Sequence, residues 1–248
     1  MRNKIKIIAP KIFSKHKNII CGISTKCFQD KSQFGFNISF SCGDNKKLVE
    51  ENRKTFFNKL GIKENQIAFT KQTHSNNIAI TYKSKTYNNC DALITNKKNL
   101  FLSITVADCL PIFIYDMENK IVATIHSGWR GCVNGILKKT IETMQEEFNS
   151  NTKNFLCYLG PNADKCCYEV EPDVAKNFDK KFLTQKTQTK FSLDIKNFSK
   201  YILLKYGIAK NNIEISDYCT ICEKKLLHSF RRDKNFYGRM MGIIGMKI

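Results

Sequence analysis

The chain has 248 residues, of which 42% are hydrophobic and 25% charged, a composition that excludes a disordered or fibrous protein. No apolar run reaches the roughly 18 to 20 residues of a membrane-spanning helix. The apolar stretch at 7–10 is also too short for the core of a secretory signal. We therefore expect one domain over residues 1–248, in a cytoplasmic protein that does not bind membranes.

The formal net charge of +19 makes a nucleic-acid-binding protein one alternative function. Of the 41 basic residues, however, only six are Arg, the residue whose planar fork suits phosphate recognition. The lysines are scattered along the chain, mostly singly or in pairs. This distribution disfavours nucleic acid as the partner and leaves it as a secondary hypothesis.

Short runs rich in β-branched and aromatic residues recur along the chain, separated by Gly, Asn and Asp, and they predict strands. In chain order these predicted strands are 4–8, 19–23, 66–70, 77–81, 92–95, 101–106, 112–115, 121–126, 156–160, 213–216 and 242–248.

Three longer segments predict helices. The first, 45–60, has Asp44 as its N-cap and Gly61 after its last turn. The second, 132–148, carries an apolar stripe, and the third begins after Asp194 and ends before Gly207. Strands therefore dominate, and we expect an α+β fold: a mixed β-sheet sandwich with flanking helices.

The chain has only four histidines, and two of them, His74 and His126, lie where predicted strands end. Cys109 lies in a polar break between two hydrophobic strands. Two imidazoles and one thiolate suit Zn²⁺ and leave a fourth position open, as in catalytic zinc sites. Each residue alone could equally be an ordinary core or surface residue, because their separations match no ligand spacing.

Two further features suggest polar chemistry. Asp108 precedes Cys109, and a buried carboxylate is costly unless it is paired. The turn 128–131 opens a predicted helix and carries Arg130, which suits an anion such as phosphate. The alternative is a plain strand-to-helix turn. Three of the six arginines lie near the C-terminus: Arg231, Arg232 and Arg239. One or two of them could bind an anionic ligand or form a buried ion pair, and the alternative is a solvated basic loop.

Eleven cysteines are many for a chain that we expect to be cytoplasmic, and most fit buried reduced thiols. The single CxxC motif, 219–222, has no second CxxC with which to complete a zinc ribbon. We therefore assign it no function. The doublet Cys166–Cys167 also receives no role from the sequence.

Together, a series of motifs in this order resembles the YfiH-like, laccase-domain family. The motifs are TKQTHSN (70–76), DALIT (91–95), TVADCLP (105–111), HSGWRG (126–131), LGP (159–161), CYEV (167–170), DYCT (217–220), SFRRD (229–233) and GRM (238–240). The resemblance extends over nearly the whole chain. The pair TVADCLP and HSGWRG is far more specific than a lone CxxC.

This resemblance implies a zinc-dependent purine nucleoside phosphorylase of mixed αβ sandwich fold, which we expect to be a monomer. The implied reactions convert adenosine, inosine, guanosine and methylthioadenosine, with phosphate, to the free base and a ribose 1-phosphate. Deamination of adenosine to inosine is also implied. The family's zinc ligands fall on His74, Cys109 and His126, the three residues already selected by their chemistry.

The candidate catalytic residues are Asp108, Cys109 and Arg130. Zinc would lower the pKa of water and so supply hydroxide for attack at adenine C6, with Asp108 orienting a ligand or transferring protons. Phosphate would bind near Arg130, Lys26 or Arg232. Many members of the family have Arg followed by a glycine-containing turn near the N-terminus, where this chain has Lys26-Cys27-Phe28, so its activity could differ. Asn37 keeps the asparagine that follows this turn.

The residues also bear on two other enzyme classes. The older family label, multicopper polyphenol oxidase, requires a blue-copper site and a histidine-rich cluster, and four histidines cannot supply both. A cysteine hydrolase with Cys109 as nucleophile and His126 as base remains an alternative, but it leaves His74 without a role.

Overall fold

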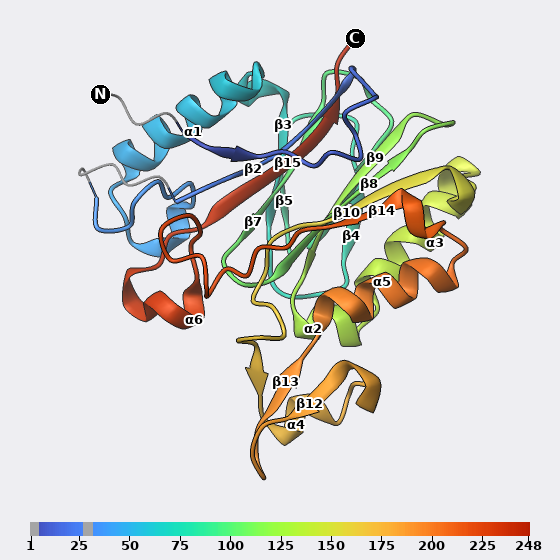
Figure 1. Ribbon diagram of the computed structural model, residues 1–248. Coiled ribbons are helices and arrows are strands. Elements are labelled where there is room, and N and C mark those ends of the chain that lie inside the picture. Colours follow the sequence, from blue (N-terminus) through green and yellow to red (C-terminus); the bar gives the residue numbers. More distant parts are fainter. Residues whose placement is uncertain (1–4, 27–31) are drawn as a thin grey trace.

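Two six-stranded β-sheets form the centre of the computed structural model, which describes residues 5–26 and 32–248 (Figure 1). The first sheet has the order β1 (Ile7–Ile8), β2 (Ile19–Ser24), β15 (Met240–Met246), β7 (Phe101–Val106), β3 (Ile67–Lys71) and β5 (Thr86–Asn88). The second has the order β14 (Ile213–Ile215), β10 (Phe155–Leu159), β8 (Leu110–Asp116), β9 (Ile121–Ser127), β6 (Ala92–Thr95) and β4 (Ile78–Ile80).

Strand β8 shows why the two sheets pack against each other. Successive side chains of a strand point to opposite faces, and every residue of β8 is buried. Phe113 and Tyr115 join the hydrophobic cluster between the sheets. Ile112 and Ile114 join a second cluster on the outer face, where helices cover the sheet. A central strand without a polar face therefore requires covering on both sides.

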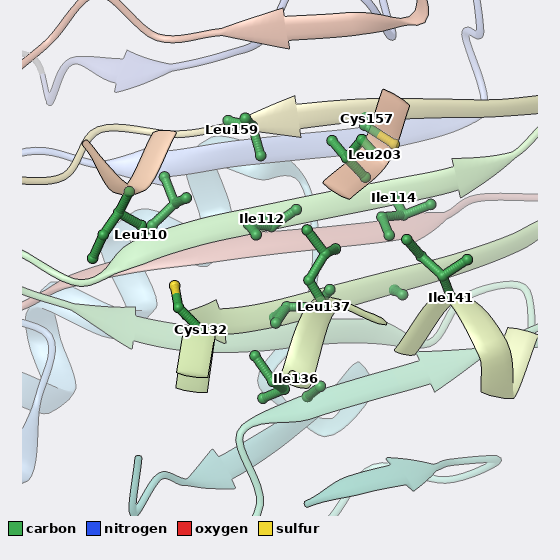
Figure 2. Close-up of a cluster of buried hydrophobic side chains, with 14 of the residues drawn as sticks. Leu110, Ile112, Ile114, Cys132, Ile136, Leu137, Ile141, Cys157, Leu159 and Leu203 are labelled. Carbon is green, nitrogen blue, oxygen red and sulfur yellow. The ribbon is translucent and has the colours of Figure 1, made fainter. Parts of the chain in front are cut away.

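Helices supply this covering. On the second sheet, α3 (Ile136–Phe148) packs over β9 and β6. Its Ile136 and Ile141 share one hydrophobic cluster with Leu203 of α5 (Ile195–Lys205) and with residues of β8 and β10 (Figure 2). On the first sheet, Phe56 of α1 (Lys46–Leu60) packs with residues of β3, β7 and β15. The fold is thus four-layered, helix, sheet, sheet, helix. The predicted α+β class, a mixed β-sheet sandwich with flanking helices in a single domain, is confirmed.

Helix boundaries differ from the prediction in two places. The N-cap of α1 is Asn45, whose side chain accepts hydrogen bonds from the backbone N–H groups of Lys47 and Leu48. Asp44 was the wrong choice, because its carboxylate accepts hydrogen bonds from Ser32 and Asn37 instead.

The predicted helix 132–148 is confirmed from Ile136 to Phe148, which form α3, but its start was wrong, because residues 132 and 133 belong to a separate short helix, α2 (Trp129–Val133). Gly135 between them has a φ of 73° in the left-handed region, which ends α2. The third prediction is confirmed, since the Asp194 side chain accepts a hydrogen bond from the Asn197 backbone at the start of α5.

A small third sheet lies beside the sandwich, with the order β11 (Glu169–Val170), β13 (Phe191–Leu193) and β12 (Leu183–Gln185), next to α4 (Pro172–Ala175). Its strands and β5 have two or three residues each, too few for a periodic pattern, and the sequence did not predict them. The last helix, α6 (Phe230–Asp233), precedes β15. Within the described ranges, no helix has the length and apolar character that crossing a membrane requires. Lys4, Cys27 and Phe28, which the predictions include, lie outside these ranges.

Candidate metal centre and active site

Three segments bring His74, Cys109 and His126 together at one end of the sandwich. Strands β8 and β9 pair in register, with Leu110 opposite Ser127, which places Cys109 beside the end of β9. One donor atom from each of the three side chains lies within 4.8 Å of the others, and Cys109 Sγ is 3.8 Å from His74 Nε2. Nitrogen and sulfur ligands of a tetrahedral zinc are about 3.6 Å apart. The spacing therefore suits a shared metal ion.

Asp91 holds two of these segments in place. Its fully buried carboxylate accepts hydrogen bonds from the backbone N–H groups of Thr73 (3.2 Å), His74 (3.1 Å) and Ser75 (2.8 Å). It also accepts one from the Ser75 hydroxyl and lies 2.8 Å from His126 Nδ1. Because a carboxylate only accepts, this contact keeps a proton on His126 Nδ1, so Nε2 is the ring nitrogen that can bind a metal.

The backbone around the centre is unusual in two residues. His74 has a φ of 59° and Asp108 a φ of 91°, both in the region that side chains rarely adopt. Such conformations persist when surrounding contacts compensate for their cost. The three N–H groups bound to Asp91 do this for the turn at His74.

Gly128 permits the close approach of the ligands. A Cβ atom at this position would lie 2.9 Å from Cys109 Sγ and 3.2 Å from His74 Cδ2. Only glycine leaves room for both side chains, so the glycine of the HSGWRG motif serves the centre itself.

The electrostatics of the centre favour a thiolate. Burial is the largest effect on Cys109 and opposes its ionisation, but the facing His126 and His74 together outweigh it and lower the pKa of Cys109 to about 6. Burial also opposes protonation of His126, yet the Cys109 thiolate and the Asp91 carboxylate raise the pKa of His126 to about 9. The thiolate is the form that binds metals and also the form that acts as a nucleophile.

A pocket of about 430 Å³ opens above the three residues. This volume lies within the range of pockets that bind small molecules. Its other lining residues are mostly polar, aromatic or basic: Gln72, Thr105, Ala107, Asp108, Gly128, Trp129, Arg130, Tyr168, Ile195, Phe230, Arg231, Tyr237 and Arg239. The pocket can therefore hold an anion and a flat ring side by side.

Asp108 and Arg130, two of the predicted catalytic residues, both line this pocket. Asp108 accepts hydrogen bonds from the Thr220 hydroxyl (2.6 Å) and the Arg231 backbone (2.8 Å). The Arg130 guanidinium lies 4.3 Å from the centroid of the Trp129 ring. Among the described residues, no carboxylate forms an ion pair with Arg130.

The other predicted phosphate-binding residues lie outside the pocket lining. Lys26 forms an ion pair with Asp233 at 3.2 Å. The Arg232 guanidinium binds both carboxylate oxygens of Asp233 and the carbonyls of Thr220, Ile221 and Leu227.

Asn37 is fully buried, and its Oδ1 accepts a hydrogen bond from the Arg239 backbone at 3.0 Å. Asn37 therefore does not line the pocket itself, but it fixes the backbone of Arg239, which does.

Sequence reasoning did not find Asp91 or Tyr168. Asp91 stands directly before a fully buried strand, β6, and this position was an available signal because a carboxylate next to a core strand needs partners. Tyr168 carried no such signal, since only the fold brings it to the pocket.

Nearly the whole chain matches known proteins of one family. The model of the family described as multi-copper polyphenol oxidoreductase laccase matches residues 17–247, so the chain belongs to this family. Among curated relatives, "Purine nucleoside phosphorylase YlmD" of Bacillus subtilis is 30% identical over 94% of this chain and 90% of its own. A purine nucleoside phosphorylase of Clostridium acetobutylicum is 34% identical over 78% of this chain and 80% of its own.

Solved structures agree on the fold. The hypothetical protein YfiH of Bacillus licheniformis superposes with a TM-score of 0.91 at 26% identity, over 99% of this chain and all of its own. YlmD of Geobacillus stearothermophilus superposes with a TM-score of 0.92 at 24% identity, over all of this chain and 98% of its own. The resemblance to the YfiH-like, laccase-domain family that the motifs indicated is thereby confirmed.

Proposed function

We propose that this protein is a zinc-dependent purine nucleoside phosphorylase. The observation that carries the proposal is the convergence of His74, Cys109 and His126 at the base of a pocket that is also lined by arginines and aromatic rings. The names of the curated relatives support a nucleoside and phosphate as its substrates.

The residues at the centre fit zinc. Two imidazoles and one thiolate are borderline-soft donors of the kind that zinc prefers, and Asp91 fixes the tautomer of His126. The space that Gly128 leaves is shared by two of the three ligands. With three protein ligands, bound zinc would act as a Lewis acid with one open position.

Phosphate is proposed to bind on the basic side of the pocket. Arg130 and Arg239 line this side, and Asn37 fixes the backbone of Arg239. Arg231 is held by Asp108 through its backbone, and its guanidinium lies 4.3 Å from the Tyr168 ring centroid. The planar guanidinium groups suit an oxyanion. We assign Lys26 and Arg232 a supporting role, because both bind Asp233.

In phosphorolysis, an oxygen of phosphate attacks C1′ of the ribose, and the bond from C1′ to the purine nitrogen breaks. The departing base takes the electron pair of this bond and needs a proton. The arginines would orient the phosphate and balance its charge, which keeps the attacking oxygen next to C1′. Asp108 is a positioning residue here, since both of its carboxylate oxygens accept hydrogen bonds from the pocket wall.

The purine is proposed to bind against the aromatic side. Phe230 is 54% exposed, and its ring lies edge-on to Tyr237 with centroids 4.9 Å apart. Exposed aromatic faces suit the stacking of a flat base. We propose adenosine, inosine, guanosine and methylthioadenosine as substrates, and deamination of adenosine as a second activity of the same pocket.

The experiment is a product assay with purified protein, adenosine and phosphate. We expect adenine and ribose 1-phosphate, with adenine production requiring phosphate and inosine production independent of it. A zinc chelator should stop both reactions, and added zinc should restore them. Adenine production that continues at full rate without phosphate, or after complete removal of metal, would contradict the proposal.

One observation favours a second candidate, a cysteine hydrolase. Asp91, His126 and Cys109 form a chain in which a carboxylate orients an imidazole beside a thiol of lowered pKa. This is the arrangement of an activated nucleophile. It does not account for His74, which lies 3.8 Å from the same sulfur. Zinc accounts for all three residues, so we rank it first.

A further inference from the structure

A second group of potential metal ligands lies outside the active-site pocket. Cys166 and Cys167 belong to the turn after β10, and Cys219 and Cys222 belong to the turn after β14. Their four sulfur atoms lie within 4.8 Å of one another. Cys222 Sγ is 3.7 Å from Cys166 Sγ and 3.4 Å from Cys167 Sγ.

The fold itself makes these two turns meet. Strands β10 and β14 are parallel neighbours, so the segments that leave their carboxyl ends start at the same edge of the second sheet. Asn162 and Cys219 then form an isolated parallel bridge, and the Thr220 backbone donates a hydrogen bond to the Asn162 carbonyl at 2.9 Å. Backbone pairing thus fixes the two cysteine pairs against each other without any bond between the sulfurs.

We propose that Cys166, Cys167, Cys219 and Cys222 form a second, structural zinc site with four thiolate ligands. Four-coordinate tetrahedral zinc with four cysteines is a common structural site, with Zn–S bonds of about 2.3 Å. The edges of such a tetrahedron are about 3.8 Å long. The two separations from Cys222 Sγ are close to this length.

The surroundings can stabilise four thiolates. The Asp164 backbone N–H donates to Cys219 Sγ at 3.5 Å. Behind the turns lies Lys196, which is only 4% exposed and whose ammonium group binds the carbonyls of Ser216 (2.7 Å) and Tyr218 (3.1 Å). It also forms an ion pair with Asp164 at 2.8 Å. A zinc ion with four thiolates carries a charge of −2, and an N–H donor to sulfur such as that of Asp164 favours it. The Lys196 ammonium is neutralised by Asp164, and its contacts with Asp164, Ser216 and Tyr218 hold the two cysteine-bearing segments together.

A disulfide accounts for the cluster less well. All four residues are free thiols in the structure. The separations of Cys222 Sγ from Cys166 Sγ (3.7 Å) and Cys167 Sγ (3.4 Å) are far from the S–S bond length of about 2.05 Å and close to the spacing of thiolates around zinc. Two of the thiols, Cys166 and Cys222, are exposed, so a metal could reach the site without unfolding of the core.

The site would also stabilise one wall of the active-site pocket. Cys167 precedes Tyr168, which lines the pocket. Cys219 precedes Thr220, whose hydroxyl donates to Asp108 beside Cys109. The turn that holds Cys166 and Cys167 leads into β11 of the small third sheet. Zinc at the four cysteines would therefore join the small third sheet and the Thr220 turn to the sandwich. A closed site outside the reacting groups would thus have a structural role in the wall of the pocket.

The test is elemental analysis of the full chain purified under reducing, oxygen-free conditions. We expect about two zinc ions per chain in the wild type, and about one in Cys222→Ser, because one missing thiolate opens a closed site. Cys109→Ser should also retain about one, and the double variant about none. Cys42→Ser is the matched control, since Cys42 belongs to neither group, and it should keep both ions.

Cobalt substitution distinguishes the two sites by their ligands. Cobalt in a four-thiolate site gives stronger thiolate-to-metal charge-transfer absorption than cobalt with one thiolate. We expect Cys222→Ser to lose most of this absorption and Cys109→Ser to lose little. If the cysteine variants do not fold, X-ray absorption of the wild-type protein decides, with an expected average of about 2.5 sulfur ligands per zinc.

Three results would overturn the proposal. One is a zinc content of one per chain that Cys109→Ser abolishes and Cys222→Ser leaves unchanged. Another is a disulfide among the four cysteines in the protein isolated under these conditions. The third is iron with acid-labile sulfide in place of the second zinc. These readouts do not use catalytic activity, so they stand whether or not the phosphorylase proposal holds.

Discussion

Replacing Asp91 with asparagine tests the architecture of the metal centre. The two carboxylate oxygens divide their partners: Oδ2 accepts from Thr73 and from the backbone and hydroxyl of Ser75, and Oδ1 accepts from His74 and lies next to His126 Nδ1. The side-chain NH₂ group of asparagine must occupy one of these places. At Oδ2 it would face three donors, and at Oδ1 it would donate to His126 Nδ1, which moves the ring proton to Nε2.

Both arrangements have a cost that can be estimated. Each charge-assisted hydrogen bond contributes about 1.5 to 3 kcal/mol, and a buried donor left unpaired costs a similar amount. We therefore expect Asp91→Asn to lower the free energy of unfolding by about 3 kcal/mol. Because a proton on Nε2 blocks metal binding by His126, zinc affinity should fall roughly 10- to 100-fold.

The two effects are measured separately. Urea unfolding gives the change in stability, and competition with a chromophoric chelator gives the zinc affinity of the folded protein. The matched control is Asp116→Asn at the far end of β8, about 20 Å away along the strand. Asp116 is also fully buried and accepts hydrogen bonds from the backbone of Glu118 and Asn119. This control should lose stability and keep its zinc affinity.

The pH dependence of the free energy of unfolding should also show the contribution of the Asp91 carboxylate. Burial opposes ionisation of Asp91, but hydrogen bonds from His126 and Ser75 outweigh it and hold the pKa of Asp91 below its usual range. Its contribution to stability is therefore present above about pH 4 and is lost as the pH falls below that.

If Asp91→Asn bound zinc as tightly as the wild type, Asp91 would have no role in orienting the ligands.

Three further predictions concern single residues. Gly128→Ala places a methyl group 2.9 Å from Cys109 Sγ, so chelator competition should show zinc affinity reduced about 10-fold or more, and an unchanged affinity would refute the role of this glycine. Arg130→Ala should raise the KM for phosphate about 10-fold and leave the KM for the nucleoside nearly unchanged, whereas unchanged phosphate kinetics would assign Arg130 to packing on Trp129. Burial lowers the pKa of His228 to about 3. Below about pH 6.5 the unfolded chain therefore binds a proton at His228 that the native protein does not bind, which lowers the free energy of unfolding. Urea unfolding should therefore show a loss of about 2 kcal/mol between about pH 7.5 and pH 5 from this group, and His228→Gln should lack this loss, while an unaltered pH profile would contradict it.

The convergence of His74, Cys109 and His126 could be predicted because the chemistry of each residue is visible in the sequence. With only four histidines in the chain, His126, which ends a predicted strand, and His74, which lies between two, stand out beside Cys109. Strand β8 could also be predicted, because its apolar run is long. These predictions depend on residue type and on local position along the chain. That His74, Cys109 and His126 bind a metal remains a prediction.

The four-cysteine cluster could not be predicted in this way. One of its two pairs is the adjacent doublet Cys166–Cys167. Only the pairing of β10 with β14 brings this doublet to Cys219 and Cys222. Such pairing is a long-range property. The break between α2 and α3 was missed for a different reason, because the apolar stripe continues across Gly135 while the backbone does not.

Zinc content measured together with turnover in Cys109→Ala and Cys109→Asp decides whether Cys109 binds a catalytic metal. We expect Cys109→Ala to bind one zinc fewer per chain than the wild type and to lose both phosphorolysis and deamination. Cys109→Asp should regain some of this zinc and a trace of activity, because a carboxylate can also bind zinc. A Cys109→Ala variant with the zinc content of the wild type and no activity would refute the role of Cys109 as a metal ligand and identify it as a nucleophile.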